Sequence, residues 1–355
     1  MYQRNSRQCC TAMVVLSLLL RLAMMLGLDS MAASAIVRTA EDPDFARWML
    51  YRETGQLVRV VSPPEDPRLW VLRWEQAGHA QETPPAVSRK PEETAPLPTA
   101  LASAGEITVA GGCSYPRDPS ALLARPSCLD FSQDGPHVLI VHSHGSEAYT
   151  PDDGRTYAES GSYRTLDPDK SVVQVGRVLA QALEDRGIAV IHDPTMNDYP
   201  SYNSSYYNSL QRIGYWKQQY PSLQMVIDIH RDAAQDAGGQ AVALSSTQNG
   251  ESCAQLMLVV GTDQGGLQHP LWQESLANAL KLQSVLEGMY PGLCRNLDLR
   301  TERFNQHMTP GSVLVEVGVN GNTLTQAERS AVLLGDGLAR MIHALTATGG
   351  TLTTE

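Results

Sequence analysis

The sequence predicts an α/β fold, a three-layer, mainly parallel sheet with helices on both faces. Two observations support this prediction. Continuous apolar runs such as Val138–Val141 and Val313–Val315 have the composition of strands buried on both faces. Segments with helical spacing, such as residues 171–186, alternate with these runs along the chain. Such alternation is typical of parallel sheets whose two faces are covered by helices.

From Val138 onward, the sequence predicts strands that alternate with helices. The expected strands are residues 138–142, 188–191, 225–232, 241–246, 255–260 and 313–317. The expected helices are residues 171–186, a segment ending near 219, residues 272–288 and residues 324–345. Gly187 provides a stop for the first helix. The sequence Thr325-Gln326-Ala327-Glu328 has the form of a capping box and is expected to open the last helix.

The composition argues against two classes of protein, nucleic-acid-binding proteins and disulfide-rich proteins. The formal net charge of -11 argues against a nucleic-acid backbone as the main partner. Six cysteines are too scattered for a disulfide scaffold, and the absence of a CxxC pair argues against a cysteine-based zinc site. Cys113 and Cys128 could bridge in an oxidising compartment, but buried or loop thiols without a role are the favoured interpretation.

Residues 1–30 have the pattern of an export segment. Arg4 and Arg7 precede a largely apolar stretch over residues 9–28. This stretch is either an uncleaved membrane anchor, which its length favours, or a cleavable signal ending near residues 33–35. In both cases the chain after residue 30 is expected to face outward, because the positive charges stay inside.

Three further regions follow the export segment. Residues 31–75 form a membrane-proximal segment of unknown role. Residues 76–105 are rich in Pro, Glu, Ala and Thr and are expected to be a solvated linker. Residues 106–348 form the expected catalytic domain.

Three metal-binding side chains follow apolar runs. His144 and Glu147 come directly after the first strand, and His230 ends another. Active sites in open α/β sheets collect at such strand ends. Two histidines and one glutamate also make a common ligand set of catalytic zinc sites, which leaves a fourth position for water. The sequence therefore predicts a zinc-hydrolase site.

His142 and Glu316 complete this prediction. His142 lies two residues before His144, so it is an alternative ligand to Glu147, a residue that orients a ligand, or a satisfied histidine at the strand end. Glu316 lies within an apolar strand, where an unpaired carboxylate is costly unless a metal is near. We expect Glu316 to be the general base that takes a proton from the attacking water.

Polar side chains near these strands are candidates for supporting roles. Arg231 is a candidate catalytic residue that could polarise a carbonyl or bind a carboxylate. Asp228 and Asp232 are equal candidates for orienting His230. Polar and aromatic residues of three loops are candidates for substrate binding, and these are Tyr202, Asn203, Asn305, Gln306 and Asn320.

Several long motifs resemble one known family. They are His142–Tyr149, Asp228–Ala233, Arg303–Gln306 and Glu316–Thr323. In order and spacing they resemble stage II sporulation protein P of endospore-forming bacteria. The resemblance covers roughly residues 105–345.

The resemblance implies a fold similar to that of zinc amidases and carboxypeptidases. It also implies a zinc-dependent peptidoglycan hydrolase, an N-acetylmuramoyl-L-alanine amidase that also cleaves peptide cross-links. Members remodel the wall while the mother-cell membrane engulfs the forespore, and their catalytic domain lies outside the cytoplasm. The implied partners are the lytic transglycosylase stage II sporulation protein D and stage II sporulation protein M. By the same resemblance His144, Glu147 and His230 match the zinc ligands, and Glu316 matches the catalytic acid.

Two alternatives stay open from the sequence. One is a zinc carboxypeptidase that trims stem peptides and uses Arg231 or Arg303 to hold a free carboxylate. The other is a non-catalytic, membrane-anchored wall-binding protein, although the complete set of ligands and base argues against it.

Overall fold

The computed structural model describes residues 101, 107–152 and 154–352. The expected export segment over residues 1–30 and the membrane-proximal segment over residues 31–75 lie outside the described residues. So does the expected linker, apart from Leu101. Within the described part of the chain, no helix combines the length and the hydropathy that a membrane crossing requires.

A seven-stranded sheet forms the centre of the domain. Its order is β1-β8-β7-β9-β4-β2-β3. The strands are β1 (Val109–Ala110), β8 (Leu297–Leu299), β7 (Leu256–Val260), β9 (Val313–Val319), β4 (Met225–Asp232), β2 (Val138–Val141) and β3 (Val190–His192). Neighbours are parallel except at the β7–β9 pair, which is antiparallel. The prediction of a mainly parallel sheet is therefore confirmed.

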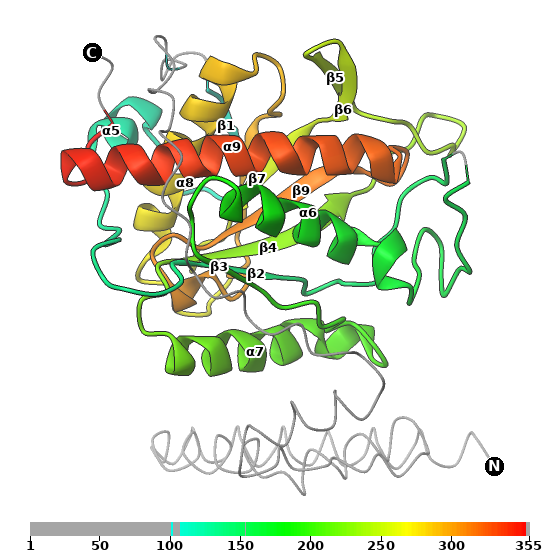
Figure 1. Ribbon diagram of the computed structural model, residues 1–355, viewed down its shortest axis with the longest axis horizontal. Coiled ribbons are helices and arrows are strands. Elements are labelled where there is room, and N and C mark those ends of the chain that lie inside the picture. Colours follow the sequence, from blue (N-terminus) through cyan, green and yellow to red (C-terminus); the bar gives the residue numbers. More distant parts are fainter. Residues whose placement is uncertain (1–100, 102–106, 153, 353–355) are drawn as a thin grey trace, which may run out of the picture. The chain divides into compact units, whose positions relative to one another are not determined.

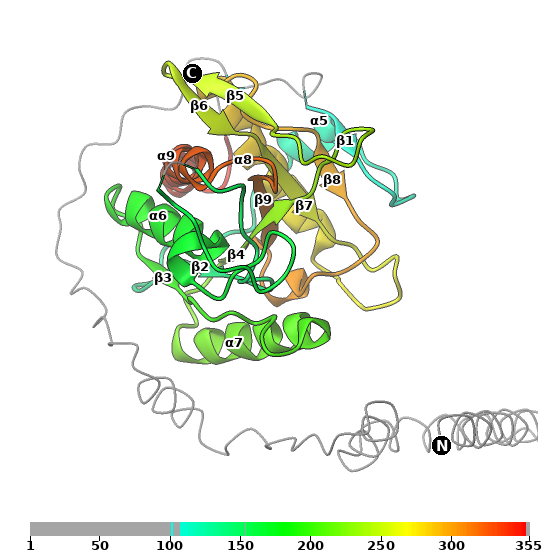
Figure 2. The same cartoon turned by 90° about the vertical axis from the view of Figure 1, so that its right-hand side faces the viewer.

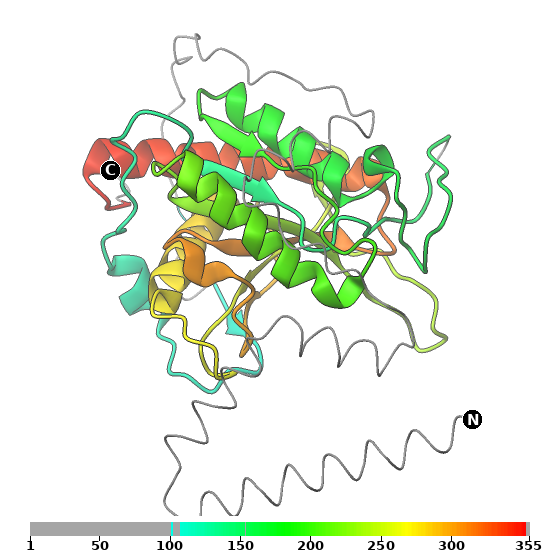
Figure 3. The ribbon, with the colours of Figure 1, turned by 90° about the horizontal axis from the view of Figure 1, so that it is seen from below.

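Helices cover both faces of this sheet (Figure 1). The helices are α5 (Pro119–Ala124), α6 (Val172–Glu184), α7 (Ser205–Gln219), α8 (Trp272–Met289) and α9 (Leu324–Thr348). Figure 2 shows α6 and α9 on one side of the central strands and α7 on the other. Seen from below, α7 lies across the strands (Figure 3). The sheet with helices on both faces has the three layers that the sequence predicts.

The alternation of side chains along β2 explains why both faces need a helix. Val138 and Ile140 belong to the large apolar cluster that includes residues of α6, α8 and α9. Leu139 and Val141 face the opposite way and join a smaller cluster with Ile213 of α7. All four residues of β2 are fully buried. A strand of this kind has no polar face, which is why it reads as a continuous apolar run.

Several short elements differ from the expectation. A separate hairpin joins β5 (Ser245–Gln248) to β6 (Glu251–Ala254), so the expected strand at 241–246 begins later. Asn249 and Gly250 both have positive φ, at 52° and 82°, as a tight two-residue turn requires. The described part of the chain also contains three 3-10 helices, η1 (Pro168–Lys170), η2 (Tyr202–Ser204) and η3 (Gln306–Met308).

The last helix begins at a different cap from the predicted one. The capping box of α9 joins Thr323 and Gln326, so the expected box at Thr325–Glu328 was wrong. The side chain of Thr323 accepts from the Gln326 backbone N–H, and the Gln326 side chain reaches back to the Thr323 N–H. Thr325 already lies inside the helix, where its hydroxyl donates to Asp152. Both segments fit the capping-box pattern, and the chain uses the earlier one.

The two cysteines that could have paired are free. Cys113 is buried, with its sulfur 3.6 Å from the Thr262 hydroxyl, and Cys128 is exposed. The favoured interpretation of these residues as thiols is in accord with the structure.

Gly176 lets α6 approach the histidines below it. A Cβ at this position would lie 2.5 Å from Cε1 of His142 and 2.9 Å from Nε2 of His192. The two rings are in contact, with their Nε2 atoms 2.9 Å apart. A methyl group therefore has no space here unless the pair moves.

We expect Gly176→Ala to destabilise the domain by about 1–3 kcal/mol, because overpacking outweighs the higher helix propensity of alanine. Gly214→Ala in α7 is the matched control, since a Cβ there meets nothing within 4 Å. Its expected effect is a stabilisation of about 0.5–1 kcal/mol. Chemical denaturation of both variants measures the difference, and equal shifts would contradict the close approach at Gly176.

Candidate active site

The loop after β2 places two side chains next to each other. The Glu147 backbone N–H donates to the His144 carbonyl at 3.1 Å and closes a turn. This turn brings Nδ1 of His144 to 3.4 Å from Oε1 of Glu147. Glu147 is buried, and His144 keeps a small exposed fraction. The His-x-x-Glu spacing therefore becomes one local pair of possible ligands.

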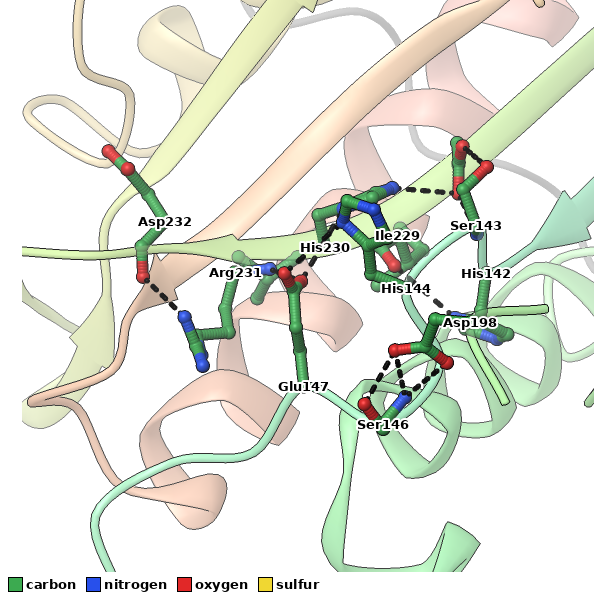
Figure 4. A network of polar contacts seen from close by, with 12 residues as sticks. His142, Ser143, His144, Ser146, Glu147, Asp198, Ile229, His230, Arg231 and Asp232 are labelled. Atoms are coloured by element: carbon green, nitrogen blue, oxygen red, sulfur yellow. Dashed lines mark hydrogen bonds and ion pairs between the residues drawn. The ribbon is translucent and has the colours of Figure 1, made fainter. Parts of the chain in front are cut away.

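Strands β4 and β9 supply the other two residues. His230 lies directly opposite Glu316 in the parallel β4–β9 register. Nδ1 of His230 is 3.4 Å from Oε2 of Glu147, so the two oxygens of this carboxylate face different histidines (Figure 4). The strands thus bring together residues that are more than eighty positions apart in the chain.

His144, Glu147 and His230 form a group that fits a metal ion. Their ligand atoms all lie within 4.8 Å of one another. Zinc bonds of about 2.0–2.2 Å in tetrahedral geometry place neighbouring ligand atoms about 3.4 Å apart. Each histidine lies at about this distance, 3.4 Å, from one of the two oxygens of the Glu147 carboxylate. Among the described residues this is the only such group of histidine, cysteine and acidic side chains.

Charge in the group also suits a cation. Burial lowers the pKa of His230, but the carboxylates of Asp228 and Glu147 outweigh it and hold this pKa well above its ordinary value. Burial raises the pKa of Glu147, but contacts with His144 and His230 outweigh it and hold the pKa well below the ordinary range. Two buried carboxylates therefore share one imidazole, and a divalent cation can replace the proton on His230.

Asp228 orients His230 from behind. Its Oδ1 lies 3.1 Å from Nε2 of His230, which leaves Nδ1 to face Glu147. Asp228 is in turn held by Ser143, whose backbone N–H donates at 2.8 Å and whose hydroxyl donates at 2.5 Å. Asp232, the other candidate, instead pairs with Arg295 at 2.8 Å and lies apart from His230 (Figure 4).

We expect Asp228→Asn to weaken metal binding by about 10- to 100-fold, because the ring of His230 loses its anionic partner. Asp232→Asn is the matched control on the same strand and should change the affinity less than about threefold. Competition with a chelating dye measures both. Equal losses in the two variants would contradict the orienting role of Asp228.

Glu316, opposite His230 in the β4–β9 register, has one carboxylate oxygen without a partner in the described part of the chain. Its Oε2 is buried and has no hydrogen-bond partner within the described residues. Burial raises the pKa of Glu316 to about 8, and the Glu147 carboxylate adds to this rise against the opposing effect of His230. A carboxylate with such a pKa can take up and release a proton near neutral pH, as a general acid or base does.

Arg231 has a different place from the expected catalytic one. Its guanidinium donates to the carbonyls of Ala148 and Tyr163, both at 2.8 Å. Its backbone N–H donates to Oε2 of Glu147 at 3.1 Å. The side chain is therefore used in holding the loop that carries Glu147, and it does not face the ligand group.

His142 lies outside the ligand group. Its Nδ1 is 3.3 Å from the Ile229 carbonyl, and its Nε2 is 2.9 Å from Nε2 of His192. Both ring nitrogens are thus engaged away from His144. Burial lowers the pKa of His142 to about 4, so the ring stays neutral. Of the two alternatives, the arrangement favours Glu147 as the ligand and His142 as a buried, satisfied histidine.

The expected substrate-binding residues divide into two sets. Tyr202 and Asn203 are exposed, and the ring of Tyr202 stacks on His144 with centroids 4.6 Å apart. Tyr202 is therefore placed for contact with a ligand at the metal group, and Asn203 follows it on the exposed surface.

The other three expected substrate-binding residues use their amides within the protein. Asn305 donates to the Tyr206 carbonyl and to the Ser209 hydroxyl. Gln306 bonds the backbone of Gly261 and Val259, and Asn320 accepts from the Ala234 N–H. All three are buried. They support the loops around the site and do not face a ligand.

Two further residues, Arg164 and Asp198, hold the site. Arg164 donates to Asp198 at 2.8 Å and lies 3.4 Å from Oε1 of Glu147. Asp198 accepts from the backbone N–H and the hydroxyl of Ser146. The pair joins the loop after β2 to the loop before α7. Each is an ordinary charge in a polar loop, and no spacing links them.

Comparison with known proteins identifies the family. The model of stage II sporulation protein P matches residues 75–339, about three quarters of the chain. The chain belongs to the stage II sporulation protein P family. The resemblance carried by the motifs is thereby confirmed. The family motifs include all four residues His144, Glu147, His230 and Glu316.

One curated relative of the family is stage II sporulation protein P of Bacillus subtilis strain 168. It is 28% identical over 217 residues, which are 58% of this chain and 50% of the relative. The chain thus spans about half the length of this curated relative.

Solved structures give a more distant likeness. The CwlD amidase of Clostridioides difficile, solved in complex with the GerS lipoprotein, is 15% identical, with a TM-score of 0.37 over 58% of this chain and 98% of that chain. The N-acetylmuramyl-L-alanine amidase Ami1 of Mycobacterium smegmatis is 13% identical, with a TM-score of 0.36 over 61% of this chain and 100% of that chain.

Proposed function

We propose that this protein is a zinc-dependent peptidoglycan hydrolase. The observation that carries the proposal is the group formed by His144, Glu147 and His230, with the buried carboxylate of Glu316 beside it. The chain's membership of a sporulation family supports the cellular setting. Zinc bound by these three residues would act as a Lewis acid and would lower the pKa of a coordinated water to about 7.

The chain's own residues account for the remaining steps. Glu316 takes a proton from the attacking water and returns it to the leaving amine, for which its pKa near 8 is suitable. Asp228 keeps Nδ1 of His230 turned toward the site. Arg231 and Arg164 keep Glu147 in place between the two histidines.

The proposed bond is the amide between N-acetylmuramic acid and L-alanine, with peptide cross-links as a further target. We place this activity in wall remodelling during engulfment, with stage II sporulation proteins D and M as partners. The N-terminal segment would anchor the chain in the mother-cell membrane, with the catalytic domain outside the cytoplasm and facing the forespore. These assignments rest on family membership and on the residues of the export segment.

The carboxypeptidase alternative has less support. It needs an arginine that is free to hold a terminal carboxylate, yet Arg231 bonds backbone carbonyls and Arg303 donates to the Gln268 carbonyl. A wall-binding protein without catalysis would not need the complete ligand group and an unpartnered buried carboxylate.

A digest of purified peptidoglycan by the full chain tests the proposal. We expect intact stem peptides to be released from the glycan, and we expect a chelator to abolish the release and added zinc to restore it. Mass spectrometry of the products identifies each broken bond, and split cross-links would add endopeptidase activity. Release that is insensitive to the chelator would contradict the zinc mechanism.

A further inference from the structure

A continuous row of aromatic rings includes one of the candidate metal ligands. The ring of Tyr206 lies 5.7 Å from Phe304 and 5.4 Å from His144. His144 in turn stacks on Tyr202, with centroids 4.6 Å apart and an angle of 21° between the planes. Aromatic surface therefore begins at the ligand group and continues outward from it.

The outer part of this row is open to solvent. Tyr202, which ends the row, is 52% exposed. Tyr199 is not one of the stacked rings of the row, but it lies three residues earlier on the same loop and is 59% exposed. Residues 199–208 contain tyrosine, asparagine, serine and proline, with no charged side chain. The nearby charges of Arg164 and Asp198 neutralise each other in an ion pair of 2.8 Å. The surface thus offers rings, hydroxyls and amides without net charge.

The position of Tyr202 is fixed from within the protein. The guanidinium of Arg164 lies over its ring, 4.8 Å from the centroid. Arg164 is itself held by Asp198 and by the Ser146 hydroxyl. A half-exposed ring that is held in this way is a preorganised contact for a ligand, because little side-chain freedom is lost on binding.

These features match the chemistry of a sugar next to the proposed bond. In a muramyl peptide three covalent bonds separate the sugar ring from the carbonyl carbon, so the ring lies within about 4 Å of the reacting centre. Tyr202 stacks directly on the candidate metal ligand His144, so it borders the place where a sugar next to the reacting centre would lie. A sugar ring is uncharged, has one apolar face of C–H groups and carries hydroxyls at its edge, which suits aromatic stacking beside amides.

We propose that Tyr202, with Tyr199 beside it on the loop, binds the N-acetylmuramic acid ring of the glycan strand. This inference rests on the proposed function and deepens it. It makes the glycan part of the recognised substrate, so a bond attached to the sugar is preferred over a bond in a free peptide.

Binding of a peptide-free glycan tests the inference without catalysis. The probe is an oligosaccharide of alternating N-acetylglucosamine and N-acetylmuramic acid, titrated against the full chain carrying Glu316→Gln. We expect Tyr202→Ala and Tyr199→Ala each to weaken binding by about tenfold. Val332→Ala, at an exposed apolar position of α9 on the other face of the sheet, is the control and should stay within about twofold.

Tyr199→Ala keeps the test valid if Tyr202→Ala disturbs His144, because no contact of Tyr199 with the ligand group is present in the described part of the chain. Absence of glycan binding by the parent protein would overturn the inference. So would tyrosine variants that bind like the Val332 control.

A kinetic ratio provides the second measurement. We compare kcat/KM for a glycan-linked stem peptide with kcat/KM for a sugar-free cross-linked peptide. The ratio should fall about tenfold in Tyr199→Ala, and an unchanged ratio would contradict the inference. Glycan binding that depends on the tyrosines without any hydrolysis would reject the proposed function alone. Amide hydrolysis with tyrosine-independent binding would reject the inference alone.

Discussion

Glu316→Gln is expected to lower kcat by about a thousandfold or more while zinc stays bound. The amide keeps the size of the side chain but cannot accept the proton of the attacking water, and general bases contribute about 10²- to 10⁴-fold. The ligand atoms of His144, Glu147 and His230 are unchanged by this substitution. Turnover on purified peptidoglycan and metal content measured on the same sample test both parts of the prediction.

Glu251→Gln is a suitable control for this experiment. Glu251 is exposed on the β6 strand and pairs with Arg329, so its substitution should leave kcat within about twofold. Full turnover in the Glu316 variant would exclude Glu316 as the base. Loss of zinc together with turnover would instead point to a ligand role for this carboxylate.

His230→Ala is expected to remove both the metal and the activity. The substitution deletes one of the three candidate ligands and leaves the carboxylates of Asp228 and Glu147 buried without their shared partner. Removing one partner of a buried charged pair costs about 3–5 kcal/mol, so the thermal midpoint should fall as well. Elemental analysis, a digest and a thermal melt measure the three effects.

His137→Ala is the histidine control for this variant. His137 lies just before β2, with its Nδ1 3.1 Å from the Ser222 carbonyl, at the end of the strand opposite to His144. It should keep its zinc and its turnover. A His230 variant that retains a full equivalent of zinc would show that the metal is held elsewhere.

The sequence predicts best the strands that appear as long apolar segments. Strand β2 is a continuous apolar run that is followed by His144, and the largely apolar strands β4 and β9 carry His230 and Glu316. Parallel pairing then aligns β4 with both β2 and β9, so the candidate ligands meet. The pattern therefore predicts the candidate site together with the fold.

The sequence indicates less clearly the direction of each strand and the role of each polar side chain in the site. The run that forms β7 is as apolar as its neighbours, and nothing in it indicates that it pairs antiparallel with β9. Asn305 and Gln306 were expected at the substrate, yet they bond backbone groups. The same residue type can support a loop or face a ligand. Only its hydrogen-bond partners in the folded structure distinguish the two roles. Arg164 was missed for the same reason.

The pairing of β4 with β9 also sets the order in which activity can arise. The ligands come from the loop after β2 and from β4, but Glu316 follows about eighty-five residues after His230. Contacts of such long range form late in folding, because the closure of a long loop comes before any gain from pairing. The candidate site is therefore complete only once the late strand β9 has paired with β4, because this pairing brings Glu316 beside the ligands.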